Sequence, residues 1–590
     1  MSGLPFPTPA VPTPQAVPTP LTRAPAHPRR QRLALGLLFL VLSLTMLRLT
    51  PARLTGSLPD NLGDPALIAW LMDWAAHSVV TDPAHYFDAP IFAPNTGTTA
   101  YTDSLLPQAA VFGPVHALAG SASWALAFNI TLIALVMANL AATYALVRWL
   151  TGRADAALVA ALGFVFSSFF LGHVGNTQLL AAWFLPAGFL LLFRVLIAAR
   201  LRDGAALGVV TVGQVLAAAY FGVVWGLSAV LVVAGWFLVR RRVSWRQVRA
   251  LGLAAIVAVA LLVPLTAPYL ALQSDPAFAR SLFPRGSFEW VDLLIPIRGN
   301  PVWHVLFTTF GYRNEHTAFP GLLMTVLAAI GFLTVISRRA AAPDRPGSGS
   351  PSDRRLALLL LLVAGAAAAV LSSGPVIAGH PAPFAFFADH VPGFNGVRVP
   401  ARLAVVAMLA AAVLAGVGWA ALTGRLSARN RQLLTGLTCL VVLVEIGGPI
   451  PWATLPVDDR TLAVYRTLDR LGPGTVIELP MPNPGSGEYP YVEAPRQLYA
   501  TLDFHPRVNG YSGYSPPGYD ADTRLFVNFP APDTITRLGR LGVRWVVVHG
   551  GPQDGAGQYG PASRARILAT LPAGFGITPI GDDLLLERDA

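Results

Sequence analysis

The sequence predicts a mainly α membrane protein: a polytopic bundle of about eleven transmembrane helices followed by a small external α/β domain at the C-terminus. Of its 590 residues, 54% are hydrophobic and only 12% are charged, whereas a soluble chain is usually about a quarter charged. Apolar runs of about 20 residues, the length that crosses a bilayer, recur between residues 33 and 450. From about residue 452 these runs stop and short strand-like and helix-like segments alternate.

Eleven apolar runs are long enough to cross the hydrocarbon layer as helices. The runs 205–220 and 222–239 could form one long kinked element, but a tight hairpin near Tyr220–Gly222 fits their sequence better. We expect the spans near 33–50, 124–148, 156–173, 179–199, 205–220, 222–239, 249–271, 318–337, 356–373, 401–421 and 432–450.

The arginines predict the orientation of the bundle. With the N-terminus inside, the cytoplasmic segments carry 22 arginines and the external loops of the membrane part carry eight. Because cytoplasmic loops are enriched in basic residues, we expect the N-terminus inside, the C-terminus outside, and a multi-pass location in a bacterial inner membrane. The net charge of +11 is spread over short loops without interleaved aromatic residues, which argues against a nucleic-acid partner.

Composition also divides the chain into three parts. Residues 1–32 are rich in proline and predict a disordered cytoplasmic tail. Residues 33–451 form the predicted membrane domain, and residues 452–590 the external domain, in which TVIELP and RWVVVHG resemble buried strands. The single cysteine, Cys439, excludes an intrachain disulfide. Long external loops are where function concentrates, and we expect three of them, at 51–123, 272–317 and 374–400.

The first external loop contains the clearest helix signal in the chain. Asp64 followed by Pro65 is typical of a helix start, with Asp64 capping the first backbone N–H groups. The apolar residues that follow recur at the helical spacing i, i+3, i+4 and i+7: Leu67, Trp70, Leu71 and Trp74. This narrow apolar stripe predicts a helix that lies along the membrane surface.

Six aspartates and neither lysine nor glutamate occur in this loop. Each of them taken singly is more simply explained as a solvated loop carboxylate. A sharper hypothesis is that Asp64, or Asp60 as its rival, is a general base that faces a cleft at the level of the membrane.

An acidic residue directly after the first span, then a long external loop with amphipathic helices and a series of spans, resembles the GT-C superfamily. The segments GDPALIAWLMDW and YFDAPIFAPNTGTTAYTDSLLPQAAVFGPVHAL are similar to those of bacterial members of this group of membrane glycosyltransferases, over roughly residues 33–450. The resemblance implies that Asp64 or Asp60 is the base. It gives Asp103 a role beside the base or as a ligand of a divalent cation such as Mg or Mn. The Asp-Glu pair of the protein mannosyltransferases is absent.

The same resemblance implies the reaction: inverting transfer of a hexosyl or pentosyl group from polyprenyl phosphate to an extracytoplasmic glycan, lipid or protein acceptor. The segment FNGVRVPARL is similar to the Arg-x-Pro-x-Arg element of YfhO-type membrane proteins. Arg398 is the expected ligand of the lipid phosphate. Arg402 is a second candidate ligand of that phosphate, although snorkelling to the interface is the simpler expectation for it. His173, in LGHVGNTQ, either lines the cleft or faces water.

Other segments carry weaker signals. His304 and His316 in the loop 272–317 lack a metal-like helical spacing, so we expect no metal site there, although the loop could bind an acceptor. The tyrosine-rich stretch RVNGYSGYSPPGYD is typical of a packed turn rather than a sugar platform. Two other functions remain: a non-enzymatic transporter or lipid-handling protein, and an accessory protein of envelope-polymer assembly. The absence of an obvious internal repeat and the few ionisable residues in the spans disfavour a transporter.

Overall fold

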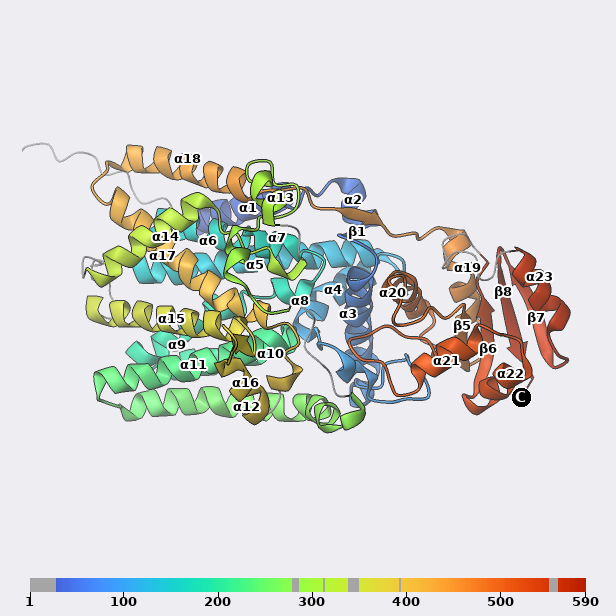
Figure 1. The fold of residues 1–590 in the computed structure, drawn as a ribbon. Coiled ribbons are helices and arrows are strands. Elements are labelled where there is room, and N and C mark those ends of the chain that lie inside the picture. Colours follow the sequence, from blue (N-terminus) through green and yellow to red (C-terminus); the bar gives the residue numbers. More distant parts are fainter. Residues whose placement is uncertain are drawn as a thin grey trace, which may run out of the picture.

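The structure is a computed structural model that describes residues 28–278, 286–310, 314–337, 350–391, 394–550 and 561–589. A bundle of long helices forms one end of the molecule and a four-stranded sheet lies at the other end (Figure 1). Two clusters of buried hydrophobic side chains fill the bundle and the opposite part. Of the predicted disordered tail, residues 1–27 lie outside the described residues, and the first helix begins at Pro28.

Every predicted span falls on a helix or on a pair of helices. Seven of these, within the described residues, are long and apolar enough to cross a membrane, so the multi-pass membrane character is supported, whereas the full count of eleven and the orientation stay predictions. The bundle consists of α1 (Pro28–Met46), α5 (Trp124–Thr151), α6 (Ala154–Val165), α7 (Ser168–Gly172), α8 (Thr177–Leu180), α9 (Phe184–Ala198), α10 (Leu201–Ala217), α11 (Ala219–Arg240), α12 (Trp245–Ser274), α14 (Leu322–Ile336), α15 (Pro351–Ser372), α17 (Val405–Thr423) and α18 (Ala428–Ile446). The stretch expected to form a hairpin consists of two separate helices in contact, α10 and α11, with the break at Ala218 rather than at Tyr220–Gly222.

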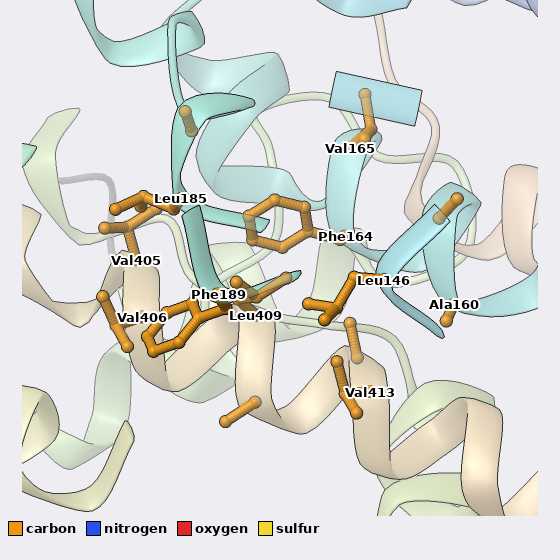
Figure 2. Close-up of a cluster of buried hydrophobic side chains, with 14 of the residues drawn as sticks. Leu146, Ala160, Phe164, Val165, Leu185, Phe189, Val405, Val406, Leu409 and Val413 are labelled. Carbon is orange, nitrogen blue, oxygen red and sulfur yellow. The ribbon is translucent and has the colours of Figure 1, made fainter. Parts of the chain in front are cut away.

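Helix α17 runs through the centre of the bundle. Its Val406, Leu409 and Val413 pack near Phe164 of α6 and Phe189 of α9 in the apolar cluster of Figure 2. On another side α17 meets α14 through two glycines. A Cβ atom at Gly418 would lie 2.0 Å from the carbonyl oxygen of Leu327, and one at Gly331 would lie 2.0 Å from that of Leu414. Close backbone contact through small residues is how helices associate without a hydrophobic driving force.

The first external loop forms α2 (Pro51–Gly56), β1 (Ser57–Pro59), α3 (Asp64–Thr81) and α4 (Leu106–Ala119). The prediction that α3 lies along the membrane surface is wrong. Trp70 is 1% exposed, and α3 packs against α4 and against α20 (Tyr489–Tyr499) of the C-terminal part. The Nε1–H of Trp74 donates to the carbonyl oxygen of Tyr86 at 3.0 Å. The helix is buried on several sides because residues outside the stripe, such as Ile68 and Met72, are also apolar.

The C-terminal part has the expected α/β character. Its sheet has the order β5-β6-β8-β7, with β5 and β6 parallel and the other pairs antiparallel, and both predicted strands are in it as neighbours. The sequence prediction missed β7 and β8. The elements are β4 (Trp452–Thr454), α19 (Asp459–Leu468), β5 (Thr475–Leu479), α20, α21 (Tyr519–Phe526), α22 (Pro532–Arg540), β6 (Val543–Val548), α23 (Pro561–Thr570), β7 (Phe575–Ile580) and β8 (Asp583–Arg588).

A buried charge network lies behind this sheet. Glu478 of β5 accepts hydrogen bonds from Arg507 Nε at 2.7 Å and from Tyr465 Oη at 2.9 Å, and its carboxylate lies 2.9 Å from His549 Nε2. Burial and Arg496 act to lower the pKa of His549, but the hydrogen bonds to Asp583 and Glu478 outweigh them and raise it to about 9. His549 is therefore a cation at neutral pH and contributes to the charge balance of the network.

We expect Gly418→Ala to destabilise the bundle, because the added methyl group would collide with the carbonyl oxygen of Leu327 and push α14 from α17. Overpacking of this kind costs about 1–3 kcal/mol. Thermal unfolding of the purified protein in detergent measures the loss. The control is Gly436→Ala on α18, where a Cβ atom would meet nothing within 4 Å. Equal unfolding temperatures for the two variants would contradict the close α14–α17 contact.

The stability of the C-terminal part should fall as the pH rises. Because the pKa of His549 is about 9 in the folded protein against an ordinary value of 6.5, its contribution is complete below pH 6.5 and is lost on passing pH 9. A shift of this size corresponds to about 3 kcal/mol. Burial also raises the pKa of Glu493 to about 7. Its contribution to stability is therefore also lost as the pH rises, but at a lower pH than that of His549. Thermal unfolding from pH 6 to 9.5 should show this slope in the wild type and a flatter one in His549→Gln.

Candidate functional site

Two acidic residues meet where the chain turns from β1 into α3. β1 pairs with β4 from the start of the C-terminal part, and the Asp60 N–H donates to the carbonyl oxygen of Pro451 at 2.8 Å. Asp60 itself adopts a left-handed backbone, with φ of 71°, which is uncommon outside glycine and is tolerated best by Asn and Asp. Gly63, not Asp64, is the N-cap of α3, and Asp64 makes no capping hydrogen bond there. The expected capping role of Asp64 is therefore wrong, and its carboxylate is left for other contacts.

The carboxylate of Asp64 is exposed but held from two sides. Tyr511 Oη donates to Oδ1 at 2.8 Å, and Asn176 Nδ2 donates to Oδ2 at 3.3 Å. Asn176 comes from the turn between α7 and α8, whereas Tyr511 comes from the tyrosine-rich stretch for which sequence predicted only packing. Two donors fix the orientation of a carboxylate that still reaches solvent.

Asp60 differs from Asp64 in its electrostatics. Burial of its carboxylate and the negative charge of Asp64 raise the pKa of Asp60, against the opposing effects of His173 and of the hydrogen bond from Asn61 Nδ2 at 2.7 Å. His173 is 4% exposed, so it does not face water. Its turn packs on the start of α3, since a Cβ atom at Gly175 would lie 2.9 Å from Pro65 and 3.4 Å from Asp60.

A buried ion pair continues the cluster beyond His173. The Nε2 atom of His173 lies 3.3 Å from Glu315 Oε2, in the short helical turn Asn314–His316. Arg402 Nε donates to the same Oε2 at 3.0 Å and Arg402 Nη2 donates to Oε1 at 2.6 Å. Burial acts to raise the pKa of Glu315, but Arg402 and His173 hold it well below its usual range. Arg402 therefore forms a two-point pair inside the protein and does not snorkel as expected.

Arg402 also covers the ring of Tyr220, the second residue of α11. Its guanidinium carbon lies 5.2 Å from the ring centroid, within the range of a cation–π interaction. The hydroxyl of Tyr220 accepts a hydrogen bond from the Arg398 backbone N–H at 3.2 Å. Arg398 and Arg402 are thus anchored through the same tyrosine.

Buried polar atoms without partners gather beside these arginines. In the described part of the chain, Arg398 Nε, Tyr269 Oη and Gln273 Oε1 have no hydrogen-bond partner. Tyr269 and Gln273 lie one turn apart near the end of α12, and the amide of Gln273 lies 2.5 Å from the Cβ position of Gly396. Because buried polar groups are normally hydrogen-bonded, the unmatched Arg398 Nε and the unmatched Gln273 Oε1, whose side chain lies beside Gly396, indicate a place where a polar ligand or water would bind.

Asp103 lies on the arginine side of the cluster rather than beside Asp64. Its Oδ1 atom accepts a hydrogen bond at 2.9 Å from the N–H of Ala219, the first residue of α11. Burial raises the pKa of Asp103, and the hydrogen bond from Ala219 and the charge of Arg402 oppose that rise. Asp103 thus accepts a hydrogen bond from a free backbone N–H at the start of α11, in addition to any role with substrate.

The described residues contain no group of three or more His, Cys, Asp or Glu side chains that could hold a metal ion. His316 Nδ1 lies 2.7 Å from Asp292 Oδ2, and this pair is buried. His304, at the start of α13 (His304–Phe310), belongs to a different element. Within the described residues, the aspartates of the first loop are not gathered into such a group.

The fold has a counterpart among solved structures. The arabinofuranosyltransferase AftD from Mycobacteria superposes with a TM-score of 0.57 and 14% identity, over 96% of this chain and 40% of that chain. The chain therefore shares the fold of the matched part of that arabinofuranosyltransferase. It spans about two fifths of the AftD chain. The resemblance suggested by the first external loop is thus confirmed for the fold.

Two further membrane glycosyltransferases of the GT-C type are more distant. The Archaeoglobus fulgidus oligosaccharyltransferase has a TM-score of 0.46 and 13% identity, over 88% of this chain and 70% of that chain. ArnT from Cupriavidus metallidurans has a TM-score of 0.35 and 15% identity, over 94% of this chain and 98% of that chain. With scores below 0.5, neither supports a conclusion. No protein-family model and no curated protein sequence matches the chain.

The structure brings together residues that sequence reasoning left apart. The charge of Asp60 interacts with those of Asp64 and His173, and His173 contacts the Glu315–Arg402 pair. The sequence predicts no separate role for Glu315. Tyr511 was not expected at the site either. A buried arginine where the chain re-enters the membrane requires a carboxylate partner. The sequence offers several carboxylates for that role, so it does not single out Glu315.

We expect Glu315→Gln to be strongly destabilising, because it leaves the Arg402 charge buried beside Tyr220 without its carboxylate. Breaking one partner of a buried pair costs about 3–5 kcal/mol. The matched control is Glu587→Gln, which removes a half-exposed Glu–Arg pair with Arg544, where the cost is about 0–1 kcal/mol. Unfolding of both variants in detergent gives the comparison. A loss for Glu315→Gln no larger than that of the control would contradict a buried pair.

Proposed function

We propose that this protein is a membrane glycosyltransferase that moves a sugar from a polyprenyl-phosphate donor to a glycan, lipid or protein acceptor outside the cytoplasm. The observation that carries the proposal is the exposed and doubly held carboxylate of Asp64. It lies near enough to Asp60 for the two charges to interact, and Asp60 interacts in turn with His173, which contacts the Glu315–Arg402 pair. The shared fold with AftD, whose name describes an arabinofuranosyl transfer, supports the reaction class.

In the proposed reaction the Asp64 carboxylate accepts the proton of an acceptor hydroxyl. The hydroxyl oxygen forms a bond to the anomeric carbon while the bond from that carbon to the phosphate oxygen breaks, and the phosphate leaves with the electron pair. Attack from the face opposite the phosphate inverts the anomeric configuration. Tyr511 and Asn176 hold the carboxylate in one orientation, which general base catalysis requires.

Asp60 is the rival base. Its raised pKa brings the carboxyl closer to the pH at which a base works best. Its neighbour Asn61 and the nearby His173 provide polar surroundings. Only substitution of each carboxylate separates the two assignments.

Arg398 is the proposed ligand of the departing phosphate. Its Nε atom is buried without a hydrogen-bond partner in the described part of the chain, and a phosphate oxygen would satisfy it. Arg402 is a positioning residue, because Glu315 occupies both edges of its guanidinium. Arg398 would thus place positive charge where negative charge develops on the leaving group.

The transporter and accessory alternatives receive less support. A transporter requires a polar path along the bundle, whereas the central contact of α17 with α5, α6 and α9 consists of aliphatic and aromatic side chains (Figure 2). An accessory protein with a decayed site would have no reason to hold the Asp64 carboxylate with two separate donors.

Transfer of radiolabelled sugar tests the base. Membranes containing the protein are given a panel of polyprenyl-phosphate sugars, and Asp64→Asn is expected to lower transfer by about 10²–10⁴-fold, the usual contribution of a general base. Asp60→Asn should have a smaller effect. The control Asp82→Asn removes an exposed loop carboxylate that contacts only the neighbouring His85 and should leave transfer unchanged.

The outcomes separate the assignments. If Asp60→Asn alone abolishes transfer in a folded protein, Asp60 is the base. If Asp64→Asn, Asp60→Asn and Asp82→Asn all transfer as well as the wild type, the mechanism is wrong. Absence of transfer from every donor of the panel, with a known transferase active in parallel, would overturn the proposed donor class.

A further inference from the structure

A large cavity lies at the end of the bundle away from the C-terminal sheet. It measures about 1040 Å³ and is enclosed by α1, α5, α6, α14, α15, α17 and α18. It lies where α5 and α17 end and where α6, α15 and α18 begin, far along the bundle from the sheet in Figure 1. The residues of the candidate site, Asp60 and Arg402 among them, do not line it.

The lining carries an excess of positive charge. Among the described residues, Arg153, Arg355 and Arg431 contribute to it beside a single carboxylate, Asp155. Arg354 also lines it and has interactions of its own. The carboxylate is already used, since it pairs with Arg153 and lies 3.8 Å from Arg431 Nε. A partly buried group of like charges is unfavourable unless a counter-charge joins it.

Arg355 and Arg431 are the arginines best placed to bind a ligand. Both are half-buried. Arg355 Nη2 donates to the carbonyl oxygen of Val335 at 3.1 Å, and its Nε atom is buried without a hydrogen-bond partner in the described part of the chain. Within the described residues, the Arg431 guanidinium makes a long contact to Asp155. Arg153, by contrast, is engaged by Asp155, Ala420 and Thr423.

The rest of the wall is apolar or small. Leu35 of α1, Leu158 of α6, Leu358 of α15 and Val417 of α17 line it, and Gly436 of α18 leaves open space beside its backbone. A cavity for a purely polar ligand would not need such walls. Arginines beside apolar helix faces instead match a molecule with a phosphate at one end and hydrocarbon at the other.

We propose that this cavity binds one anionic membrane phospholipid, with its phosphate between Arg355 and Arg431 and its acyl chains along Leu35, Leu158 and Leu358. Ordinary ligand pockets measure roughly 300–1,000 Å³, and the volume of this cavity is at the upper end of that range. A lipid headgroup together with the first part of two acyl chains requires a volume of this size. The lipid supplies the missing negative charge and fills the space between α1, α15 and α18. The site is independent of the proposed transferase chemistry.

Native mass spectrometry of the full-length protein in detergent tests this site. Dioleoyl phosphatidylglycerol is titrated against dioleoyl phosphatidylcholine, and glycerol phosphate is added as a competitor without acyl chains. We expect phosphatidylglycerol to bind at least about tenfold more tightly than phosphatidylcholine, and the double variant Arg355→Gln/Arg431→Gln to lose at least about tenfold in its affinity for phosphatidylglycerol, as two charge-assisted contacts imply.

The matched control is Arg425→Gln/Arg429→Gln, which removes the same charge from exposed positions near α18 that do not line the cavity. This control should bind phosphatidylglycerol as tightly as the wild type does. In detergent without added lipid, both double variants should keep the elution volume and the unfolding temperature of a folded protein. An equal loss of affinity in both double variants would contradict the proposal, because the positive charge at this end of the protein would then attract the lipid without a specific site.

Two other results would overturn the proposal. Equal binding of phosphatidylglycerol and phosphatidylcholine would show that the arginines do not select an anion. Displacement of the lipid by equimolar glycerol phosphate would show a site for free phosphate, because acyl chains would then contribute nothing.

Discussion

The ion pair between Glu315 and Arg402 is the contact on which the candidate site depends. It joins the loop after α12 to the re-entry of the chain into the bundle, and through His173 it reaches the turn that packs on Asp60. A buried arginine with a two-point carboxylate partner is geometrically specific, so three segments that are distant in sequence are held in one arrangement. The position of Arg398, four residues before Arg402, follows from the same anchor.

The boundary between membrane part and external domain is less sharp than composition suggests. One hydrophobic cluster contains α3 and α4 of the first external loop together with the sheet of the C-terminal part. β1 pairs with β4, with Leu58 opposite Ala453. The first external loop is therefore packed as part of the external core rather than spread on a lipid surface, which explains why Trp70 is buried.

The sequence was sufficient where a feature depends on length and composition alone. Apolar runs located every bundle helix, and local strand signals located β5 and β6. It was insufficient where burial depends on a partner. The stripe on α3 could face lipid or protein, and only the packing of α20 decides between them. Asp64 and Asp60 were found because they follow a span, whereas Glu315 and Tyr511 carry no local signal and are defined only by contacts across the fold.

The hydrogen bond between Tyr511 and Asp64 joins two residues that are 447 positions apart. Asp64 emerges from the ribosome early, with the first helices of the bundle, while Tyr511 is synthesised almost at the end of translation. The carboxylate therefore acquires its final orientation only after the last segment has been delivered to the same side of the membrane and has folded against α3. During biogenesis, an inserted but incomplete chain would hold the acidic turn without its tyrosine partner.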